Sequence, residues 1–280
     1  MKRLLPILSV LVLILSGCQT TGGNDKDWNV HFYDNCGMPK NAMRWIQDGE
    51  NKFVRFQLRD KDYGGCSSDR IRRHSAPYWE RAELKQSSTL DWDSAYELEF
   101  NVRFVKGFTG DRETFWQMHA YNSPCNASPP LMIKFSEGRL LFAALGEGGT
   151  GHVNYYSNLK INDVVGKWNV FKIKFNTFFK SKFDTSKTAK ISLFVNGNEI
   201  IPSVPYGMKT CGTPHFKFGI YRPGSLAGNN LSVADFDKIK LTRRETKFSK
   251  IKLEESHYCF NENGPNSNIE VYSVSGNCKE

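Results

Sequence analysis

The side chains of the segment Phe115-Trp116-Gln117-Met118-His119-Ala120 alternate between two sets, and this alternation is the starting point for predicting the fold. In a β-strand, successive side chains point to opposite faces of the sheet. The expected faces carry Phe115, Gln117 and His119 on one side and Trp116, Met118 and Ala120 on the other. An amide and an imidazole would then project side by side from one face of this strand.

Two other segments show the same period of two. Segment 81–85 places its three charged residues on one face, and segment 216–221 places a lysine and a tyrosine opposite its apolar residues. The side chains concerned are Arg81, Glu83, Lys85, Lys217 and Tyr221. If the three strands lie in one sheet, they present a polar, mostly cationic surface that is backed by an apolar core.

Strand patterns continue through most of the chain. Residues 96–104 alternate without a break, with apolar side chains at the even positions, which is typical of a half-buried strand. Asn196-Gly197 indicates a tight hairpin turn. No long segment repeats its apolar residues with the helical period of about 3.6. We therefore predict an all-β fold, a β-jelly roll, in which two antiparallel sheets form a concanavalin-like sandwich.

The first residues have the pattern of a bacterial lipoprotein signal. Lys2 and Arg3 precede an apolar run that is short for a membrane-spanning helix, and the segment 15–18 (Leu-Ser-Gly-Cys) has the pattern of a lipobox. We expect Cys18 to be lipidated, so that the mature protein is exported and anchored to the outer membrane; a short transmembrane anchor is the alternative. The predicted organisation is a signal peptide (1–18), a tether (19–29), a β-jelly-roll domain (30–245) and a disulfide-closed tail (246–280).

The cysteine count agrees with export. Of seven cysteines, six remain when Cys18 is lipidated, and an even number in an exported protein indicates disulfides. The nested pairing joins Cys36 to Cys66, Cys125 to Cys211 and Cys259 to Cys278, although sequence alone leaves the pairing open. A zinc site is the alternative, but there is no Cys-x-x-Cys and the histidines are scattered, so no metal is expected.

The charge balance points to an acidic partner. The 280 residues carry a net charge of +9, and loss of Lys2 and Arg3 with the signal leaves +7. A basic exported protein usually meets something acidic. The chain has no basic low-complexity arm and no nucleic-acid-binding motif. We therefore expect an acidic polysaccharide as the partner and a monomeric protein, with no role for nucleic acid.

Four of the polar side chains fit the β-elimination of a uronic acid at its O4 glycosidic bond. This reaction removes the C5 proton, stabilises the charge that builds on the adjacent carboxylate, and protonates the leaving oxygen. Gln117 and Arg81 are suited to donate hydrogen bonds to the carboxylate. His119, with an ordinary pKa of about 6.5, is suited to accept a proton. Tyr221 can protonate O4, or accept the C5 proton itself if nearby cations lower its pKa.

Other polar residues are expected around this set. Glu83 is placed between two cations in sequence and is expected to hold them rather than to act as a base. The long, Gly-rich segment 60–78 is expected to be a loop that borders the site. The expected substrate-binding residues are Lys217, Glu83, Lys85, Arg222, His74 and Tyr78.

The same three segments resemble the strand motifs of the jelly-roll polysaccharide lyases, the group that contains alginate lyases, glucuronan lyases and heparin lyase I. The motifs stand at 81–85 (Arg-Ala-Glu-Leu-Lys), 117–119 (Gln-Met-His) and 217–221 (Lys-Phe-Gly-Ile-Tyr). Further segments resemble the heparin lyase-like branch: 128–131 (Ser-Pro-Pro-Leu), 166–168 (Gly-Lys-Trp), 194–197 (Phe-Val-Asn-Gly) and 219–222 (Gly-Ile-Tyr-Arg). The similarity covers roughly residues 30 to 245.

The resemblance implies a substrate groove on the concave sheet of the jelly roll. It implies that His119 and Tyr221 are the base and acid pair, that Gln117 and Arg81 neutralise the substrate carboxylate, and that Lys217 binds substrate charge. Alginate lyases typically carry an arginine where Lys85 stands, and a longer tyrosine-containing signature near residue 215. These departures bear on the substrate rather than on elimination. No cofactor is implied; a structural calcium bound by loop oxygens is an alternative.

Two other classes of function fit parts of the pattern. A glycoside hydrolase with the same architecture would use two carboxylates, and Glu97 and Glu99 share a strand face. A retaining pair of this kind must lie about 5–5.5 Å apart across the scissile bond. A non-catalytic carbohydrate-binding lipoprotein would keep the cationic surface without requiring His119 and Tyr221 together.

Overall fold

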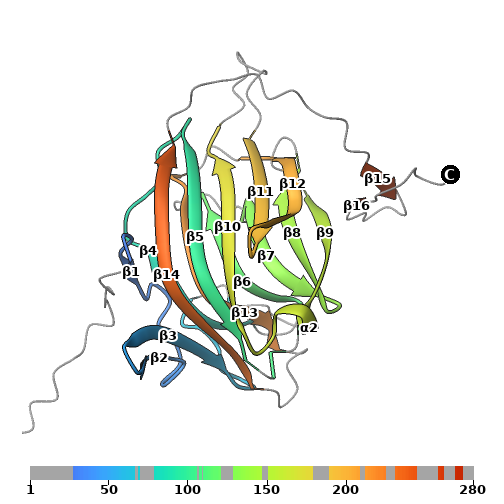
Figure 1. Ribbon diagram of the computed structural model, residues 1–280. Coiled ribbons are helices and arrows are strands. Elements are labelled where there is room, and N and C mark those ends of the chain that lie inside the picture. Colours follow the sequence, from blue (N-terminus) through green and yellow to red (C-terminus); the bar gives the residue numbers. More distant parts are fainter. Residues whose placement is uncertain are drawn as a thin grey trace, which may run out of the picture.

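A computed structural model describes two antiparallel β-sheets stacked face to face, with β14, β5 and β10 in front of β6 and β7 in Figure 1. The structure describes residues 28–66, 69, 79–105, 107–108, 110–120, 129–146, 151–178, 189–208, 212–224, 231–244, 258–261 and 269–273. The predicted two-sheet antiparallel sandwich is thereby confirmed.

The described strands form one sheet of nine strands and one of seven. The first sheet contains, in order, β1 (Phe32–Tyr33), β4 (Trp79–Gln86), β13 (His215–Pro223), β6 (Glu113–His119), β7 (Leu131–Ser136), β8 (Arg139–Leu145), β9 (His152–Lys160), β16 (Ile269–Ser273) and β15 (Tyr258–Asn261). The second contains β12 (Asn198–Tyr206), β11 (Ala189–Val195), β10 (Trp168–Asn176), β5 (Ala95–Phe104), β14 (Ser232–Arg244), β3 (Asn51–Leu58) and β2 (Met43–Asp48). A short helix, α2 (Ile161–Val164), follows β9. The pairing of β16 with β9 is parallel, whereas the other strand pairs are antiparallel.

The three segments singled out in the sequence are neighbours in the first sheet, although they lie far apart along the chain. Strand β13 is paired with β4 on one side and with β6 on the other. Tyr221 stands opposite Arg81, and Lys217 stands between Lys85 and Gln117. Residues directly opposite each other in an antiparallel pair share a face. The expected common surface of the three segments is therefore present.

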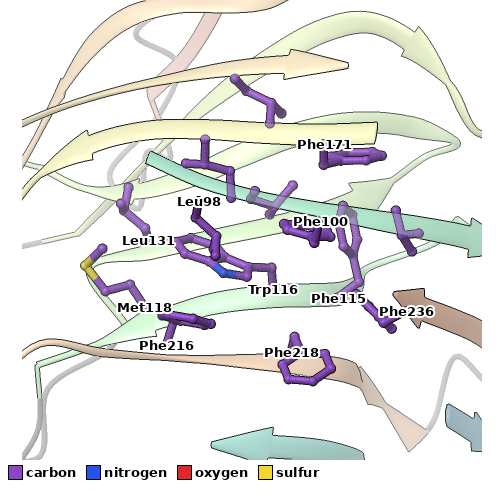
Figure 2. Close-up of a cluster of buried hydrophobic side chains, with 14 of the residues drawn as sticks. Leu98, Phe100, Phe115, Trp116, Met118, Leu131, Phe171, Phe216, Phe218 and Phe236 are labelled. Atoms are coloured by element: carbon purple, nitrogen blue, oxygen red, sulfur yellow. The ribbon is translucent and has the colours of Figure 1, made fainter. Parts of the chain in front are cut away.

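Aromatic and aliphatic side chains from both sheets fill the space between them, as Figure 2 shows. Phe100 of β5 stacks on Phe171 of β10 at 5.7 Å between ring centroids, and Trp116 of β6 packs against Phe216 of β13. Each such side chain, when fully buried, contributes about 1.5–3 kcal/mol of hydrophobic stabilisation. This core holds the first sheet in place, so the polar side chains on the other face of that sheet rest on a rigid support.

The position of Phe115 differs from the expectation. The register between β6 and β7 shifts between Thr114 and Trp116, which marks a β-bulge. Both Phe115 and Trp116 therefore point into the core (Figure 2). Phe115 lies 4.9 Å from Phe104 between ring centroids. The prediction that Phe115 shares a face with Gln117 was wrong. A period of two cannot reveal the inserted residue of a bulge.

One predicted disulfide is confirmed. Cys36 and Cys66 are bonded, with a Cα–Cα distance of 4.6 Å. Cys125, Cys211, Cys278 and the side chain of Cys259 lie outside the described part of the structure, as do the signal peptide with Cys18 and most of the tether and tail. Within the described ranges, no helix combines the length and the apolar character needed to cross a membrane.

Candidate active site

The outer face of the nine-stranded sheet, meaning the face directed away from the core, carries the predicted site residues. They are Arg81 and Glu83 on β4, Gln117 and His119 on β6, and Lys217 and Tyr221 on β13. Arg81, Glu83, Gln117 and Lys217 are buried, whereas His119 and Tyr221 are partly exposed. The two side chains that were expected to exchange protons are therefore the accessible ones, and the four buried side chains surround them.

Arg81 is held by two carboxylates. Its Nε and Nη2 donate hydrogen bonds to the two carboxylate oxygens of Asp69, at 2.8 Å each, and its Nη1 donates to Glu83 Oε2 at 2.5 Å. Burial disfavours the charged guanidinium, but Glu83 and Asp69 outweigh this penalty and raise the pKa of Arg81. Arg81 is thus a permanent, rigidly placed positive charge.

Asp69 was not among the predicted site residues. It lies three residues after the disulfide-bonded Cys66, and its side chain is almost fully buried against Arg81. The approach depends on Gly64, because a Cβ at that position would collide with the Asp69 carboxylate. The sequence offered a weak signal, an acidic residue in a Gly-rich segment, but no pattern that connects it to β4.

A hydrogen-bonded chain links Glu83 to His119. Gln117 Nε2 donates to Glu83 Oε1 at 2.5 Å, and Gln117 Oε1 lies 3.1 Å from His119 Nε2. Glu83 was expected to hold Arg81 and Lys85; its Oε2 binds Arg81 as expected, whereas its Oε1 accepts the bond from Gln117. The chain fixes the Gln117 amide and orients the imidazole beside it.

Tyr221 is fixed by contacts on both sides of its ring. The guanidinium carbon of Arg81 lies 4.1 Å from the ring centroid, which is a cation–π geometry. The ring also stacks on Trp79 at 4.7 Å between centroids. Gly219 allows β13 and β4 to approach here, because a Cβ at its φ of +141° would collide with the carbonyl oxygen of Ala82.

The imidazoles and amine on this face have lowered pKa values. Burial lowers the pKa of His119 well below its ordinary value, and the positive charges of Lys217, His215, Arg81 and Lys85 lower it further. Burial lowers the pKa of Lys217 to about 8; Glu83 opposes this shift, whereas Arg81 and Lys85 add to it. Burial and the charge of Lys85 lower the pKa of His215, whose ring stacks on His119, to about 4. His119 is consequently neutral at neutral pH and can accept a proton.

The structure separates Arg222 from the substrate-facing set. Arg222 is 2% exposed and lies on the core side of β13, where it donates to Glu80 at 2.7 Å and to Glu113 at 3.1 Å. Ser232 also donates to Glu113. The predicted substrate contact of Arg222 was therefore wrong, because alternation along β13 turns it away from Tyr221.

The remaining predicted residues have different outcomes. Lys85 lies on the outer face opposite Lys217, with its amine 5.8 Å from the centroid of the Tyr33 ring. His74 and Tyr78 lie outside the described residues. Glu97 and Glu99 lie on β5 in the other sheet, where both bind Lys172, at 3.4 and 2.9 Å. The carboxylate pair that a hydrolase would need is thus not on the face that carries His119.

A metal ligand set is not evident within the described ranges. The group with suitable spacing there is Cys36, Cys66 and Asp69. The two sulfur atoms are bonded to each other, and the carboxylate of Asp69 binds Arg81. These three residues are therefore already engaged, and the question of a structural calcium stays open as a prediction.

Comparison with solved structures finds the same fold in alginate lyases. A product complex of the family 7 alginate lyase A1-II′ has a TM-score of 0.50 and 16% sequence identity, covering 71% of this chain and 83% of that chain. The 1.0 Å structure of the same lyase has a TM-score of 0.50 and 17% identity, with 71% and 82% covered. Alginate lyase vAL-1 from Chlorella virus has a TM-score of 0.50 and 13% identity, with 78% and 93% covered. At these identities the likeness shows the jelly-roll fold.

Comparison with curated proteins finds no match to this chain. A family model described as polysaccharide lyase, by contrast, matches residues 21–240, which is most of the chain. The chain therefore belongs to the polysaccharide lyase family. It is an enzyme of the carbon–oxygen lyase class that acts on polysaccharides, EC 4.2.2.

Proposed function

We propose that this lyase cleaves an acidic, uronic-acid-containing polysaccharide by β-elimination, in which the C5 proton is removed and O4 leaves. The observation that carries the proposal is the placement of His119 and Tyr221. Both are partly exposed on one face, and both are held by buried polar neighbours. An imidazole and a phenol placed in this way supply the two proton transfers that the elimination requires.

The hydrogen-bonded chain supports His119 as the base and indicates which nitrogen acts. An ionised carboxylate only accepts hydrogen bonds, so Glu83 requires the NH₂ group of Gln117 to face it. The oxygen of Gln117 then faces His119, and Nε2 must carry the hydrogen that it donates. The neutral ring therefore keeps its lone pair on Nδ1. The lowered pKa of His119 maintains this neutral form, and Nδ1 is the atom that accepts the C5 proton.

Tyr221 is the proposed acid that protonates O4. Its ring is locked between Trp79 and the Arg81 guanidinium, so the phenol has a defined position. The nearby charge of Arg81 also stabilises a phenolate after proton transfer. The same charge would assist Tyr221 if it removed the C5 proton itself, which is the alternative assignment. The two assignments differ in whether His119 sets the acidic limb of the pH–rate profile.

The carboxylate of the reacting sugar is proposed to bind Gln117 and Lys217. The Gln117 NH₂ group has a second hydrogen beyond the one given to Glu83, and Lys217 lies directly opposite Gln117 in the sheet. The hydrogen bonds of Arg81 go to Asp69 and Glu83. Its positive charge acts on the site through its contacts with the Tyr221 ring and with Glu83. Positive charge that is already in place before the reaction stabilises the enolate-like transition state, because no side chain has to reorganise.

The direct experiment exposes the purified domain to alginate, glucuronan, heparin, heparan and hyaluronan and follows near-ultraviolet absorbance. Elimination creates a conjugated double bond that absorbs in this range, whereas hydrolysis creates only a reducing end. We expect absorbance to rise with at least one polymer and to be abolished in His119→Ala and Tyr221→Phe variants that remain folded. New reducing ends without absorbance would identify a hydrolase, and binding without cleavage would identify a carbohydrate-binding domain.

The proposed setting is the cell envelope. The lipobox-like segment 15–18 and the Cys36–Cys66 disulfide support an exported protein that is lipidated at Cys18. Labelling with a radioactive fatty acid tests this directly. We expect label in the wild-type protein and none in a Cys18→Ser variant; label in both would contradict the assignment of Cys18.

A further inference from the structure

A second group of polar side chains lies on the outer face, on the β7–β9 side of the candidate active site. Tyr221 stands opposite Thr114, and Thr114 stands opposite Lys134. These residues share the outer face because directly opposed residues in antiparallel strands point the same way. Neighbouring strands lie about 4.8 Å apart, so the backbone of Lys134 is roughly 10 Å from that of Tyr221.

The amine of Lys134 has no carboxylate to bind among the described residues. Its side chain is partly buried, and burial together with the charge of Arg112 lowers its pKa. Two buried guanidinium groups elsewhere in the sandwich are neutralised: Arg81 binds Asp69 and Arg222 binds Glu80. A partly buried amine without such a partner is costly unless an anion binds it.

An orphaned amide oxygen lies on the same part of the face. Asn154 Oδ1 is buried and accepts no hydrogen bond from the described residues. Asn154 is placed in the cross-strand row that contains Gln117, Met132 and Ala143, so it shares their face. Buried polar atoms are nearly always paired, and one without a partner calls for an explanation.

His152 completes this group. Its Nε2 donates to the carbonyl oxygen of Pro129 at 3.2 Å, which leaves Nδ1 as an acceptor. His152 stands two residues before Asn154 in β9, opposite Leu145, so it shares the outer face with Asn154. The charge of Lys134 helps to lower the pKa of His152, although burial has the larger effect. Beneath them lies an apolar floor of Leu141, Ala143, Tyr156 and Met132 that is separate from the main core.

We propose that Lys134, Asn154 and His152 form a second anionic-sugar subsite, which binds the acidic group and hydroxyls of a sugar adjacent to the reacting one. The inference rests on the proposed function and adds a requirement to it: the preferred polymer carries acidic groups on neighbouring sugars. Lys134 binds the carboxylate or sulfate, and the two acceptors, Asn154 Oδ1 and His152 Nδ1, bind hydroxyls. The apolar floor suits the C–H face of a sugar ring.

Lys134 and Lys217 serve different anions. The charges that act on Lys217 are those of Glu83, Arg81, Lys85 and Asp69, whereas the charge that acts on Lys134 is that of Arg112. The two amines are also apart in the sheet, because Lys217 on β13 stands opposite Gln117 and Lys134 on β7 stands opposite Thr114, with β6 between them. One carboxylate on the reacting sugar accounts for Lys217 and leaves Lys134 for the next acidic group along the polymer.

The test compares Lys134→Met with Lys172→Met. Methionine keeps the length of the lysine stem and removes the charge; Lys172 lies on the opposite sheet, bound to Glu97 and Glu99, and is the matched control. On alginate and glucuronan, in which every sugar is acidic, we expect Lys134→Met to lower kcat/KM about tenfold or more, as for loss of a charged hydrogen bond. On hyaluronan, in which acidic and neutral sugars alternate, the change should be small. Lys172→Met should leave both unchanged.

Affinity electrophoresis in gels that contain each polymer gives a second readout that does not require turnover. We expect Lys134→Met to weaken retention by alginate and glucuronan relative to wild type and Lys172→Met, and Asn154→Ala to weaken it in the same direction. Equal retention and equal kcat/KM in Lys134→Met and wild type would overturn the subsite. Absence of any new absorbance with wild-type protein would refute the proposed elimination, while the retention series would still decide whether Lys134 binds the anion.

Discussion

The side-chain amide of Gln117 donates a 2.5 Å hydrogen bond to the carboxylate of Glu83, and this single contact determines the orientation of both Gln117 and His119. Neither Glu83 nor Gln117 is among the exposed residues of the site, since each is 1% exposed. The influence of Glu83 on catalysis therefore passes through Gln117 and the partly exposed His119 ring. This relationship leads to the first prediction.

Replacement of Glu83 by glutamine should impair the base more than it impairs substrate binding. A neutral amide at position 83 both donates and accepts, so it no longer forces the NH₂ group of Gln117 toward itself. The Gln117 amide can then turn, and His119 loses its fixed tautomer. We expect kcat to fall by about 10²-fold or more, in the range of general-base contributions, with KM changed far less.

Nitrogen NMR of the His119 ring checks the cause of this loss. Wild type should show hydrogen on Nε2, and Glu83→Gln should show a mixture of tautomers. Glu97→Gln, which alters a carboxylate on the opposite sheet, is the control and should match wild type in kcat and in the spectrum. An unchanged tautomer in Glu83→Gln combined with a normal kcat would refute the role given to Glu83.

The charge of Lys217 should set the position of the acidic limb of the pH–rate profile. His119 acts as a base only when neutral, so kcat/KM falls as the pH drops through the pKa of His119, which lies below its ordinary 6.5. Lys217 is the strongest charged contributor to this lowering. Lys217→Met should therefore raise the pKa of His119 and move the acidic limb to higher pH.

Lys134→Met is the control for this shift, because Lys134 is not among the charges that act on His119. Its acidic limb should coincide with that of wild type, even though its kcat/KM on fully acidic polymers is lower. If the limb stays in place in Lys217→Met, then His119 is not the base, and Tyr221 takes its place in the mechanism.

Strand periodicity predicted which side chains share a face within β4, β13 and the end of β6, but not that the three strands are neighbours. The charged and polar side chains of these strands follow the period of two, and the pairing of β13 with both neighbours brings them together. The same rule, applied strictly, also places Arg222 on the side opposite Tyr221, so its position on the core side could have been predicted, although its partner Glu80 could not. The bulge at Phe115 could not, because nothing in the local sequence marks where one extra residue enters the ladder.

Asp69 shows a different limit of sequence reasoning. Its bond to Arg81 depends on the close approach at Gly64 and follows the Cys36–Cys66 disulfide in the chain. Neither is a periodic feature, and a carboxylate outside a periodic pattern has many alternative partners. Lys134 likewise gained its interpretation only when the strand order placed it in the same row as Tyr221.

The bond between Asp69 and Arg81 should matter for stability as well as for the site. Asp69→Asn removes the charge that binds a guanidinium 5% exposed to solvent, while Glu83 still binds it. We expect a loss of about 1.5–3 kcal/mol in the free energy of unfolding, typical of a hydrogen bond to a charged group. Denaturant titration measures this loss.

Asp91→Asn is the matched control for Asp69→Asn, because Asp91 binds Arg243 with both side chains largely exposed to solvent. Such surface pairs contribute about 0–1 kcal/mol. Equal stability losses in the two variants would show that burial does not strengthen the contact between Asp69 and Arg81.

Removal of the Arg222 side-chain charge should destabilise the fold without altering substrate affinity. Arg222 neutralises two carboxylates, Glu80 and Glu113, inside the sandwich. Arg222→Met leaves both carboxylates buried without their cation, and breaking a buried ion pair in this way costs about 3–5 kcal/mol. Thermal unfolding should therefore occur at a clearly lower temperature, whereas KM measured on folded protein should equal that of wild type.

The triple variant Glu80→Gln, Glu113→Gln and Arg222→Met separates lost charge balance from lost packing. Neutral amides no longer need the guanidinium, so this variant should recover a large part of the stability that Arg222→Met loses. Arg243→Met, at an exposed ion pair, should leave the unfolding temperature nearly unchanged. A normal unfolding temperature together with a raised KM in Arg222→Met would contradict this prediction. It would show that Arg222 contacts the substrate, as the sequence predicted, and that its ion pairs with Glu80 and Glu113 do not stabilise the fold.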